Sequence, residues 1–247
     1  MGRQNGNRAS DDTWNPSRGS GNGHNGRNVR SGVLSVGAVM NWTIGLKGHC
    51  LNFIEETHQY LIDGVEVPSI TQMLKLKFGK KYDGVSESVL YKAAERGTQM
   101  HEAIEGYVTF GAEDESTELR NFKFLMKQYK MSPIASEIPV ILFDGDEPIA
   151  AGRLDLVLER DGEKGLGDLK RTAVLDREYL AYQLNLYRRA YQQCYDTKIS
   201  FLAGIHLRED KRKLIQLPIN DYIVDEIIAK EKDYEYYNFE RETNPRP

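Results

Sequence analysis

Alternation of apolar and polar residues predicts a series of strands in the middle of the chain. Three runs, at 134–143, 149–159 and 165–171, are predicted to form strands. Asp144-Gly145 and Asp161-Gly162 separate these runs. An Asp-Gly pair between two strand-like runs is a strong signal for a hairpin turn. The pattern therefore predicts three consecutive antiparallel strands joined by turns.

Helical periodicity appears on both sides of these strands. Within 115–130, apolar residues recur every three or four positions, which is typical of an amphipathic helix that faces a core. The stripe consists of Leu119, Phe122, Leu125, Met126 and Tyr129. Further helices are expected at 86–110, with Ser86 as its cap, at 176–195, and from Asn220 or Asp221 to about 237. Further strands are expected at 198–206 and 213–218.

The segment before these elements has its own turn signals. Short alternating runs on both sides of Asp63-Gly64 predict a hairpin over 51–71. Ser69 is expected to cap a short helix at 70–77. The stretch 75–82, KLKFGKKY, is basic with interleaved aromatic residues. It is either a contact for a nucleic-acid backbone or a solvated helix end.

Residues 1–39 differ from the rest of the chain in composition. They are rich in Gly, Asn, Ser and Arg, and they lack hydrophobic periodicity, so we expect a disordered tail. The tail has five arginines and two aspartates. It is interpreted as a nucleic-acid-binding arm, as a transit peptide, or as residues ahead of a true start at Met40. A single domain is expected over 40–240, with its core at about 95–218.

Composition limits the kinds of partner and cofactor. The 247 residues carry a net charge of -4, so a nucleic-acid partner requires local basic patches rather than a global attraction. No apolar run reaches the ~18 residues of a membrane helix. Cys50 and Cys194 do not form a C-x-x-C pair, which argues against a thiolate zinc site. A reducing compartment is the default for such a chain.

Charged residues interrupt the last two strands of the central series. Asp155 lies inside one strand, and Asp168 and Lys170 lie two apart in the next, so the latter two share a face. In the simplest hairpin register, Asp155 approaches Asp168 across the ladder. Crowded carboxylates repel each other unless a cation lies between them, and their oxygens suit Mg²⁺ or Mn²⁺. Lys170 cannot ligate a metal while protonated, but it can orient water or offset phosphate charge.

A simpler interpretation of these charges has no metal. Asp155 and Lys170 form a cross-strand ion pair, and Asp168 is solvated. The D-x-K pattern alone does not decide between the two, because it occurs by chance in many chains. The surrounding residues add information: Gly152 stands three before Asp155, and Gln183 and Tyr187 lie four apart on the next helix, where they share a face.

The ordered set G-x-x-D, D-x-K and Q-x-x-x-Y resembles the PD-(D/E)XK nuclease superfamily and, within it, the RecB-type exonuclease branch. In this chain the motifs are Gly152-Arg153-Leu154-Asp155, Asp168-Leu169-Lys170 and Gln183-Leu184-Asn185-Leu186-Tyr187. The resemblance implies a mixed α/β (α+β) fold. It consists of a central mixed β-sheet flanked by helices, a restriction-endonuclease-like core with Asp155 central. Composition alone indicates only that helices and strands are both present.

The resemblance also implies a ligand set for the metal. By this analogy Asp155, Asp168 and the main-chain carbonyl of Leu169 bind it. Residues 96–105, RGTQMHEAIE, resemble the RGTxxHxxxE motif of the same branch, in which the histidine, here His101, adds a ligand. Glu137 matches the acidic position on the first core strand and is a further candidate, with a surface carboxylate as the alternative.

Other residues receive roles around this site. Lys170 is expected to orient the attacking water or to stabilise the transition state. By resemblance, Gln183 and Tyr187 contact DNA or brace the site. Arg153 lies two before Asp155 on the same strand face and is a candidate phosphate contact. Glu105 either orients the histidine one turn before it or is a solvated carboxylate, and the second interpretation is preferred.

The resulting hypothesis is a Mg²⁺- or Mn²⁺-dependent DNA exonuclease in recombination, repair or replication-linked processing. The two cysteines cannot supply the four thiolates of an iron–sulfur cluster, so the cluster-bearing type is excluded. No P-loop is present, so unwinding requires a helicase partner. The alternatives are an endonuclease of the same fold and an inactive DNA-binding subunit. By resemblance, the expected compartment is phage or bacterial-host cytoplasm, with mitochondria as an alternative, and no membrane is expected.

Overall fold

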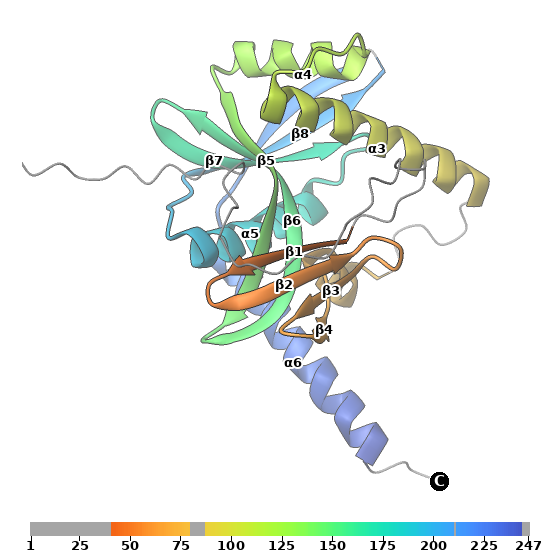
Figure 1. Ribbon diagram of the computed structural model, residues 1–247, viewed down its shortest axis with the longest axis vertical. Helices are drawn as coiled ribbons and strands as arrows, with labels where there is room; N and C mark the ends of the chain where they lie inside the picture. The colour runs from red at the N-terminus through yellow and green to blue at the C-terminus, as the bar shows by residue number, and fades with distance from the viewer. Residues whose placement is uncertain (1–40, 80–86, 210, 244–247) are drawn as a thin grey trace, which may run out of the picture. The chain divides into compact units, whose positions relative to one another are not determined.

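A computed structural model of the chain describes residues 41–79, 87–209 and 211–243. Two β-sheets and several helices make up the described residues, which confirms the expected mixture of α and β structure (Figure 1). The expected tail at 1–39, the cap at Ser86 and positions 80–82 of the basic stretch lie outside the described residues. None of the described helices is long and apolar enough to cross a membrane.

The larger sheet has five strands in sequence order. They are β5 (Ser132–Asp144), β6 (Glu147–Arg160), β7 (Glu163–Lys170), β8 (Phe201–Arg208) and β9 (Lys211–Leu217). All neighbours pair antiparallel except β7 and β8, which pair parallel. A parallel pair requires a crossover connection, and α5 (Arg177–Tyr195) provides it. The expected mixed sheet and the turn at Asp161-Gly162 are confirmed. The first hairpin is also present, but its turn is Gly145-Asp146, one residue later than expected, because Asp144 still pairs with Glu147.

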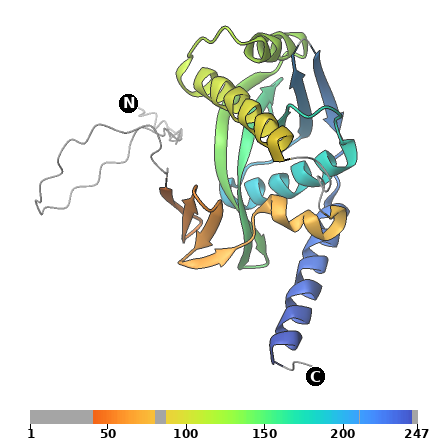
Figure 2. The same cartoon turned by 90° about the vertical axis from the view of Figure 1, so that its right-hand side faces the viewer.

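Helices α3 (Glu87–Phe110) and α4 (Thr117–Gln128) pack together and share a core with the larger sheet. Four residues of the predicted stripe on α4 are buried, and Tyr129 is partly buried beyond the end of the helix. Helix α5 packs along β5, and Figure 2 shows it crossing the long β5–β6 hairpin. The strand expected at 198–206 begins later, at Phe201, and runs to Arg208.

The smaller sheet corrects the prediction for the N-terminal segment. Its four antiparallel strands are β1 (Asn41–Leu46), β2 (His49–Ile54), β3 (Gln59–Ile62) and β4 (Val65–Val67). The expectation of one hairpin over 51–71 was wrong, because a turn at 55–58 divides this segment and β1 precedes it. The turn at Asp63-Gly64 is confirmed between β3 and β4. β1 contains Gly45, which weakens its strand pattern.

The chain after the smaller sheet connects it to the rest of the molecule. Ser69 caps α1 (Ile70–Met73) in a capping box, and a second short helix, α2 (Lys75–Phe78), follows in place of the single helix expected at 70–77. Ser69 also forms a bridge with Ala151 of β6. Because β6 extends beyond the end of β7, this part of β6 is free to take a partner from the smaller sheet's connection.

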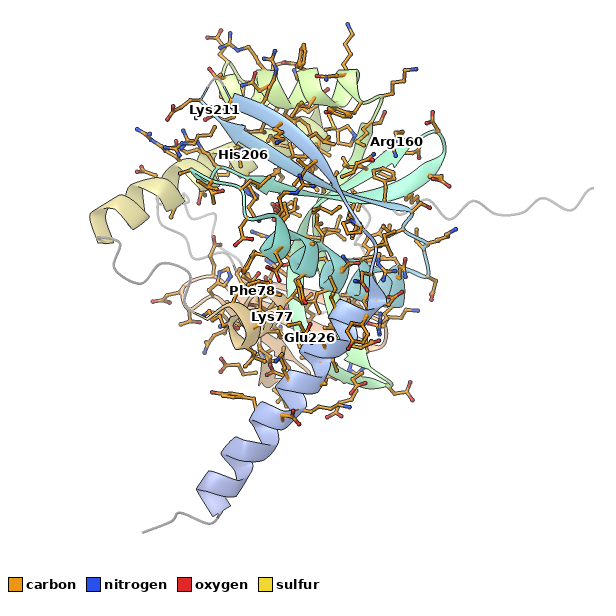
Figure 3. All side chains as sticks on the ribbon, turned by 180° about the vertical axis from the view of Figure 1, so that it is seen from behind. Lys77, Phe78, Arg160, His206, Lys211 and Glu226 are labelled. Carbon is orange, nitrogen blue, oxygen red and sulfur yellow. The ribbon has the colours of Figure 1, made fainter. Side chains whose placement is uncertain are left out.

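The last helix, α6 (Asp221–Thr243), is longer than the sequence predicted. Asn220 is its cap, since the Asn220 side chain accepts a hydrogen bond from the main-chain N–H of Tyr222 at 3.0 Å. Glu226 of α6 accepts hydrogen bonds from Lys77 of α2 at 2.9 Å and from the hydroxyl of Tyr182 at 2.7 Å. Figure 3 shows Lys77 and Glu226 side by side, so α6 is tied to both α2 and α5.

Candidate active site

Three carboxylates lie in one row across neighbouring strands of the larger sheet. Glu137 of β5 and Asp155 of β6 lie opposite each other, because the residues on both sides of each are paired across the ladder. Asp168 of β7 directly follows the last β6–β7 pair, Leu156↔Gly167. This is the register expected from the Asp-Gly turn, and it brings Asp168 next to Asp155. The row therefore collects acidic residues that are far apart in sequence.

The two strands β6 and β7 separate at this row. Beyond the last pair, the main-chain N–H of Leu169 donates to Oδ2 of Asp155 at 2.7 Å, in place of a β6 carbonyl. β7 remains paired with β8 as far as Lys170, opposite His206. A fork between strands leaves main-chain and carboxylate groups without ladder partners. One such group, the Leu169 N–H, orients the Asp155 carboxylate.

Glu137 has an unusual backbone conformation for a strand residue. Its φ is +52°, in the left-handed region that a residue with a Cβ adopts at a cost of about 1–3 kcal/mol. The conformation changes the direction of the side chain, which lies 13% exposed. Arg153 on β6 contacts it, with Nε 2.5 Å from Oε2 of Glu137, and the Arg153 guanidinium lies over the ring of Phe53 at 5.8 Å. Arg153 therefore points toward the row, as its strand position predicted.

His101 reaches the same row from α3. Its Nδ1 lies 3.4 Å from Oε1 of Glu137, and its Nε2 lies 3.9 Å from Oδ2 of Asp155. One ligand atom from each of these three residues lies within 4.8 Å of the others. Burial of the imidazole opposes its protonation, but the nearby carboxylates outweigh burial and raise the pKa of His101 from 6.5 to about 9. The carboxylates of Glu137, Asp155 and Asp168 therefore all act on this imidazole.

Glu105, one turn after His101, is not part of this three-residue group. Its side chain is half-buried rather than solvated, which differs from the preferred expectation. Burial and the negative charge of Glu137 raise the pKa of the Glu105 carboxyl. Glu105 lies close to His101 because it follows one turn later on α3, and residues four apart lie on the same helix face.

Asp168 and Lys170 form an ion pair on β7, in which Lys170 is half-buried. Asp168 is only 2% exposed, so the simpler interpretation, with a solvated Asp168 and an Asp155–Lys170 pair, was wrong. Burial raises the pKa of Asp168 to about 6, although the Lys170 ammonium acts against this. Asp168 lies outside the three-residue group. Its role as a ligand, like that of the Leu169 carbonyl, stays a prediction.

The Gly152 and Tyr187 positions are explained by one contact. A Cβ added at Gly152 would lie 2.9 Å from Cε1 and 3.0 Å from the hydroxyl of Tyr187. The ring of Tyr187 thus packs directly on the backbone of β6, three residues before Asp155. Tyr187 and Gln183 are both buried, and Oε1 of Gln183 has no hydrogen-bond partner within the described ranges. Their burial is consistent with bracing the strand from α5.

His206 is a site residue that sequence reasoning missed. It lies opposite Lys170 in the parallel ladder and is 9% exposed. Its Nε2 lies 2.7 Å from the carbonyl oxygen of Thr172, and this nitrogen carries the proton because a carbonyl only accepts. His206 thereby anchors the loop that follows Lys170. A lone histidine in an apolar strand is typical of a buried structural residue, so no sequence signal distinguished it.

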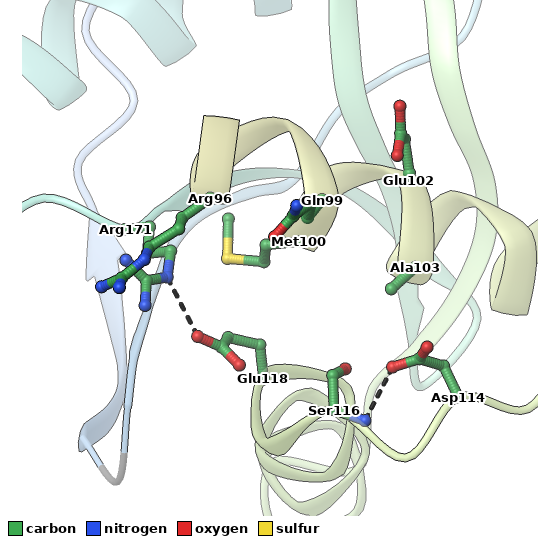
Figure 4. A pocket seen from close by; sticks show the side chains of 9 residues that line it. All are labelled: Arg96, Gln99, Met100, Glu102, Ala103, Asp114, Ser116, Glu118 and Arg171. Carbon is green, nitrogen blue, oxygen red and sulfur yellow. Dashed lines mark hydrogen bonds and ion pairs between the residues drawn. The ribbon is translucent and has the colours of Figure 1, made fainter. Parts of the chain in front are cut away.

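A cavity of about 630 Å³ lies between α3 and α4, beside the candidate site (Figure 4). Arg96 and Arg171 line one end of it, and Arg171 forms an ion pair with Glu118 at 2.9 Å. None of the candidate ligands lines this cavity. Arg171 directly follows Lys170 and points into the cavity (Figure 4). The chain after Lys170 is therefore held at two points. Arg171 ties it to Glu118 of α4, and the Thr172 carbonyl ties it to His206 of β8.

Comparison with known proteins does not assign a family. No family model matches the chain, and no curated protein matches it. Among solved structures, the crystal structure of SSO0001 is similar to this chain with a TM-score of 0.38 and 13% identity. The similarity covers 68% of this chain and 74% of SSO0001. A likeness at this level does not distinguish one mixed α and β fold from another.

Proposed function

We propose that this protein is a metal-dependent deoxyribonuclease with a PD-(D/E)XK-like core, acting as an exonuclease at DNA ends. The observation that carries the proposal is the row of Glu137, Asp155 and Asp168 at the fork between β6 and β7. His101 approaches this row from α3, and Lys170 lies two residues after Asp168 on β7. Each of these residues also belongs to the motifs that resemble the RecB-type branch.

The chemistry of the three-residue group suits a divalent cation. Two carboxylates and one imidazole place their ligand atoms within 4.8 Å of one another. Hard oxygen ligands with a nitrogen donor are compatible with Mn²⁺ and, through the carboxylates, with Mg²⁺. The carboxylates that raise the pKa of His101 also attract a cation. His101, Glu137 and Asp155 would hold the ion, with Asp168 as a further candidate.

A divalent ion bound there would lower the pKa of a water molecule and neutralise charge on the scissile phosphate. The protein's own contribution is orientation. Asp168 holds the Lys170 ammonium next to the row through their ion pair. A positively charged, preorganised donor stabilises negative charge that develops on a phosphate oxygen in the transition state. Arg153 contacts Glu137 and supplies a second positive charge close to a bound phosphate.

Preference for DNA ends rests on the resemblance rather than on the geometry. The His101 motif and the Gln183 and Tyr187 helix support the exonuclease branch over an endonuclease of similar fold. On the same grounds we propose a role in recombination, repair or replication-linked processing, with a helicase partner.

The test is degradation of end-labelled linear and circular DNA, single- and double-stranded, with Mg²⁺, Mn²⁺ or EDTA. Lys170→Ala is compared with Lys164→Ala, which removes a lysine from the same face at the other end of β7. The expected result is metal-dependent loss of linear DNA alone, abolished by the first substitution and retained with the second. Cutting of circles would indicate an endonuclease. Binding without any cleavage would indicate an inactive DNA-binding subunit.

A further inference from the structure

The β8–β9 hairpin continues the basic character of the candidate site along the same sheet face. In the ladder, Lys170 lies opposite His206, and His206 lies opposite Lys213 of β9. Residues directly opposite each other on paired strands point to the same side of the sheet. The next row on this side is the pair Arg208↔Lys211. Figure 3 shows Lys211 near the turn of the hairpin, with His206 further along β8.

The residues between these basic positions, such as Leu207 and Arg212, point to the other face of the sheet and make packing contacts there. Leu207 is buried with the α3 and α4 cluster. Its partner Arg212 donates to the side chain of Asn121 at 2.8 Å and lies over the ring of Phe124 at 3.9 Å. The hairpin is therefore divided by strand alternation, with packing contacts on one side and basic residues on the other.

The basic side is open to solvent and only weakly neutralised. Lys211 and Lys213 are exposed, and neither has an ion-pair partner among the residues that the structure describes. Arg208 has one acidic contact, with Glu209 at 3.7 Å. The chain as a whole has more acidic than basic residues. His206 lies buried between the exposed cations and Lys170, under the loop that it anchors.

We propose that Arg208, Lys211 and Lys213 bind the phosphate backbone of the nucleic-acid strand that is cleaved at the carboxylate row. This inference rests on the proposed nuclease function and adds a path for the strand. Arg208 and Lys211 lie opposite each other, about 5 Å apart, and Lys213 lies two residues, about 7 Å, further along β9. One strand of a duplex presents a phosphate about every 3.4 Å along the helix axis. Cations at these spacings can therefore each face a different phosphate of one strand.

Salt dependence of DNA binding tests the proposal, because each lysine–phosphate contact releases a counterion. Binding of labelled DNA is measured by fluorescence anisotropy in EDTA, from 50 to 200 mM salt, for wild type and Lys211→Gln/Lys213→Gln. Loss of two contacts reduces the slope of log K against log salt by about 1.4–1.8. Wild type is then expected to lose about tenfold more affinity over this range than the variant.

Lys127→Gln/Lys198→Gln is the matched control, because it removes the same charge from exposed lysines on α4 and ahead of β8. The control is expected to keep the wild-type slope. Equal slopes for all three proteins, equal losses in both variants, or absence of DNA binding by wild type would overturn the proposal. EDTA separates this test from the nuclease test. If Lys211→Gln/Lys213→Gln reduces the slope but wild type cleaves no DNA in the nuclease test, the binding surface is supported and the nuclease function is refuted.

Discussion

Replacement of Gly152 by alanine tests how β6 is held against α5. The backbone of Gly152 does not lie in the left-handed region, so alanine adopts its conformation without strain, and only space decides the effect. The added Cβ would lie 2.9 Å from Cε1 of Tyr187 and 3.3 Å from Cζ. Carbon atoms in favourable contact are about 3.5–4.0 Å apart. Either the ring or the strand must therefore move by several tenths of an ångström.

The ring has little freedom to move. Tyr187 is 6% exposed, and its hydroxyl is hydrogen-bonded to the side chain of Thr71. Overpacking of a well-packed core costs about 1–3 kcal/mol, and the reduced freedom of the unfolded chain offsets about 0.4–1 kcal/mol of this. We expect Gly152→Ala to lower the free energy of unfolding by about 1–2 kcal/mol, which corresponds to roughly 2–8 °C in Tm for a domain of this size.

Urea denaturation of four proteins measures this effect. They are wild type, Gly152→Ala, Tyr187→Leu and the double variant. If the ring causes the cost, alanine at 152 is nearly neutral in the Tyr187→Leu background, and the two sites show a coupling of about 1–2 kcal/mol. Gly45→Ala is the control, because no atom lies within 4 Å of its added Cβ. The reasoning is refuted if Gly152→Ala destabilises the Tyr187→Leu protein as much as it destabilises wild type. It is also refuted if Gly152→Ala and Gly45→Ala are equally stable.

Metal binding, loop anchoring and the α2–α6 contact give three further tests. At ten times Kd, Mg²⁺ or Mn²⁺ should stabilise wild type by about 1.4 kcal/mol, and an equal Tm rise in Asp155→Asn would contradict the ligand assignment. The glutamine of His206→Gln can still donate to the Thr172 carbonyl, whereas His206→Leu leaves this carbonyl without a donor. His206→Gln should therefore retain more nuclease turnover than His206→Leu. Equal turnover of the two variants would exclude a positioning role for His206. Hydrogen bonds from Tyr182 and Lys77 lower the pKa of Glu226 below its ordinary value of 4.5. The Glu226 carboxylate therefore stabilises the fold fully above pH 4.5. This contribution is lost as the pH falls through the lowered pKa of the folded state. The Tm difference between wild type and Glu226→Gln should therefore shrink in acid, and a pH-independent difference would contradict this.

Local pattern was sufficient for much of the larger sheet. The Asp-Gly turns fix the two hairpins, because these residues tolerate the backbone conformation that tight turns require. A side-chain period of two placed Asp168 and Lys170 on one face, and the turn at Asp161-Gly162 placed Asp155 opposite Asp168. The smaller sheet was harder, because the pairing of β1 with β2 depends on residues outside the predicted hairpin.

The amino-acid sequence by itself determined the order of helices and strands from residue 87 onward and the registers around the acidic residues, since both follow from local periodicity and turns. It also supplied the motif residues that resemble a nuclease. Only the tertiary structure decided that His101 meets Glu137 and Asp155, that Asp168 is buried with Lys170, and that His206 anchors the next loop. These contacts join residues from separate elements, and burial and electrostatic interactions depend on distances in space rather than on sequence separation.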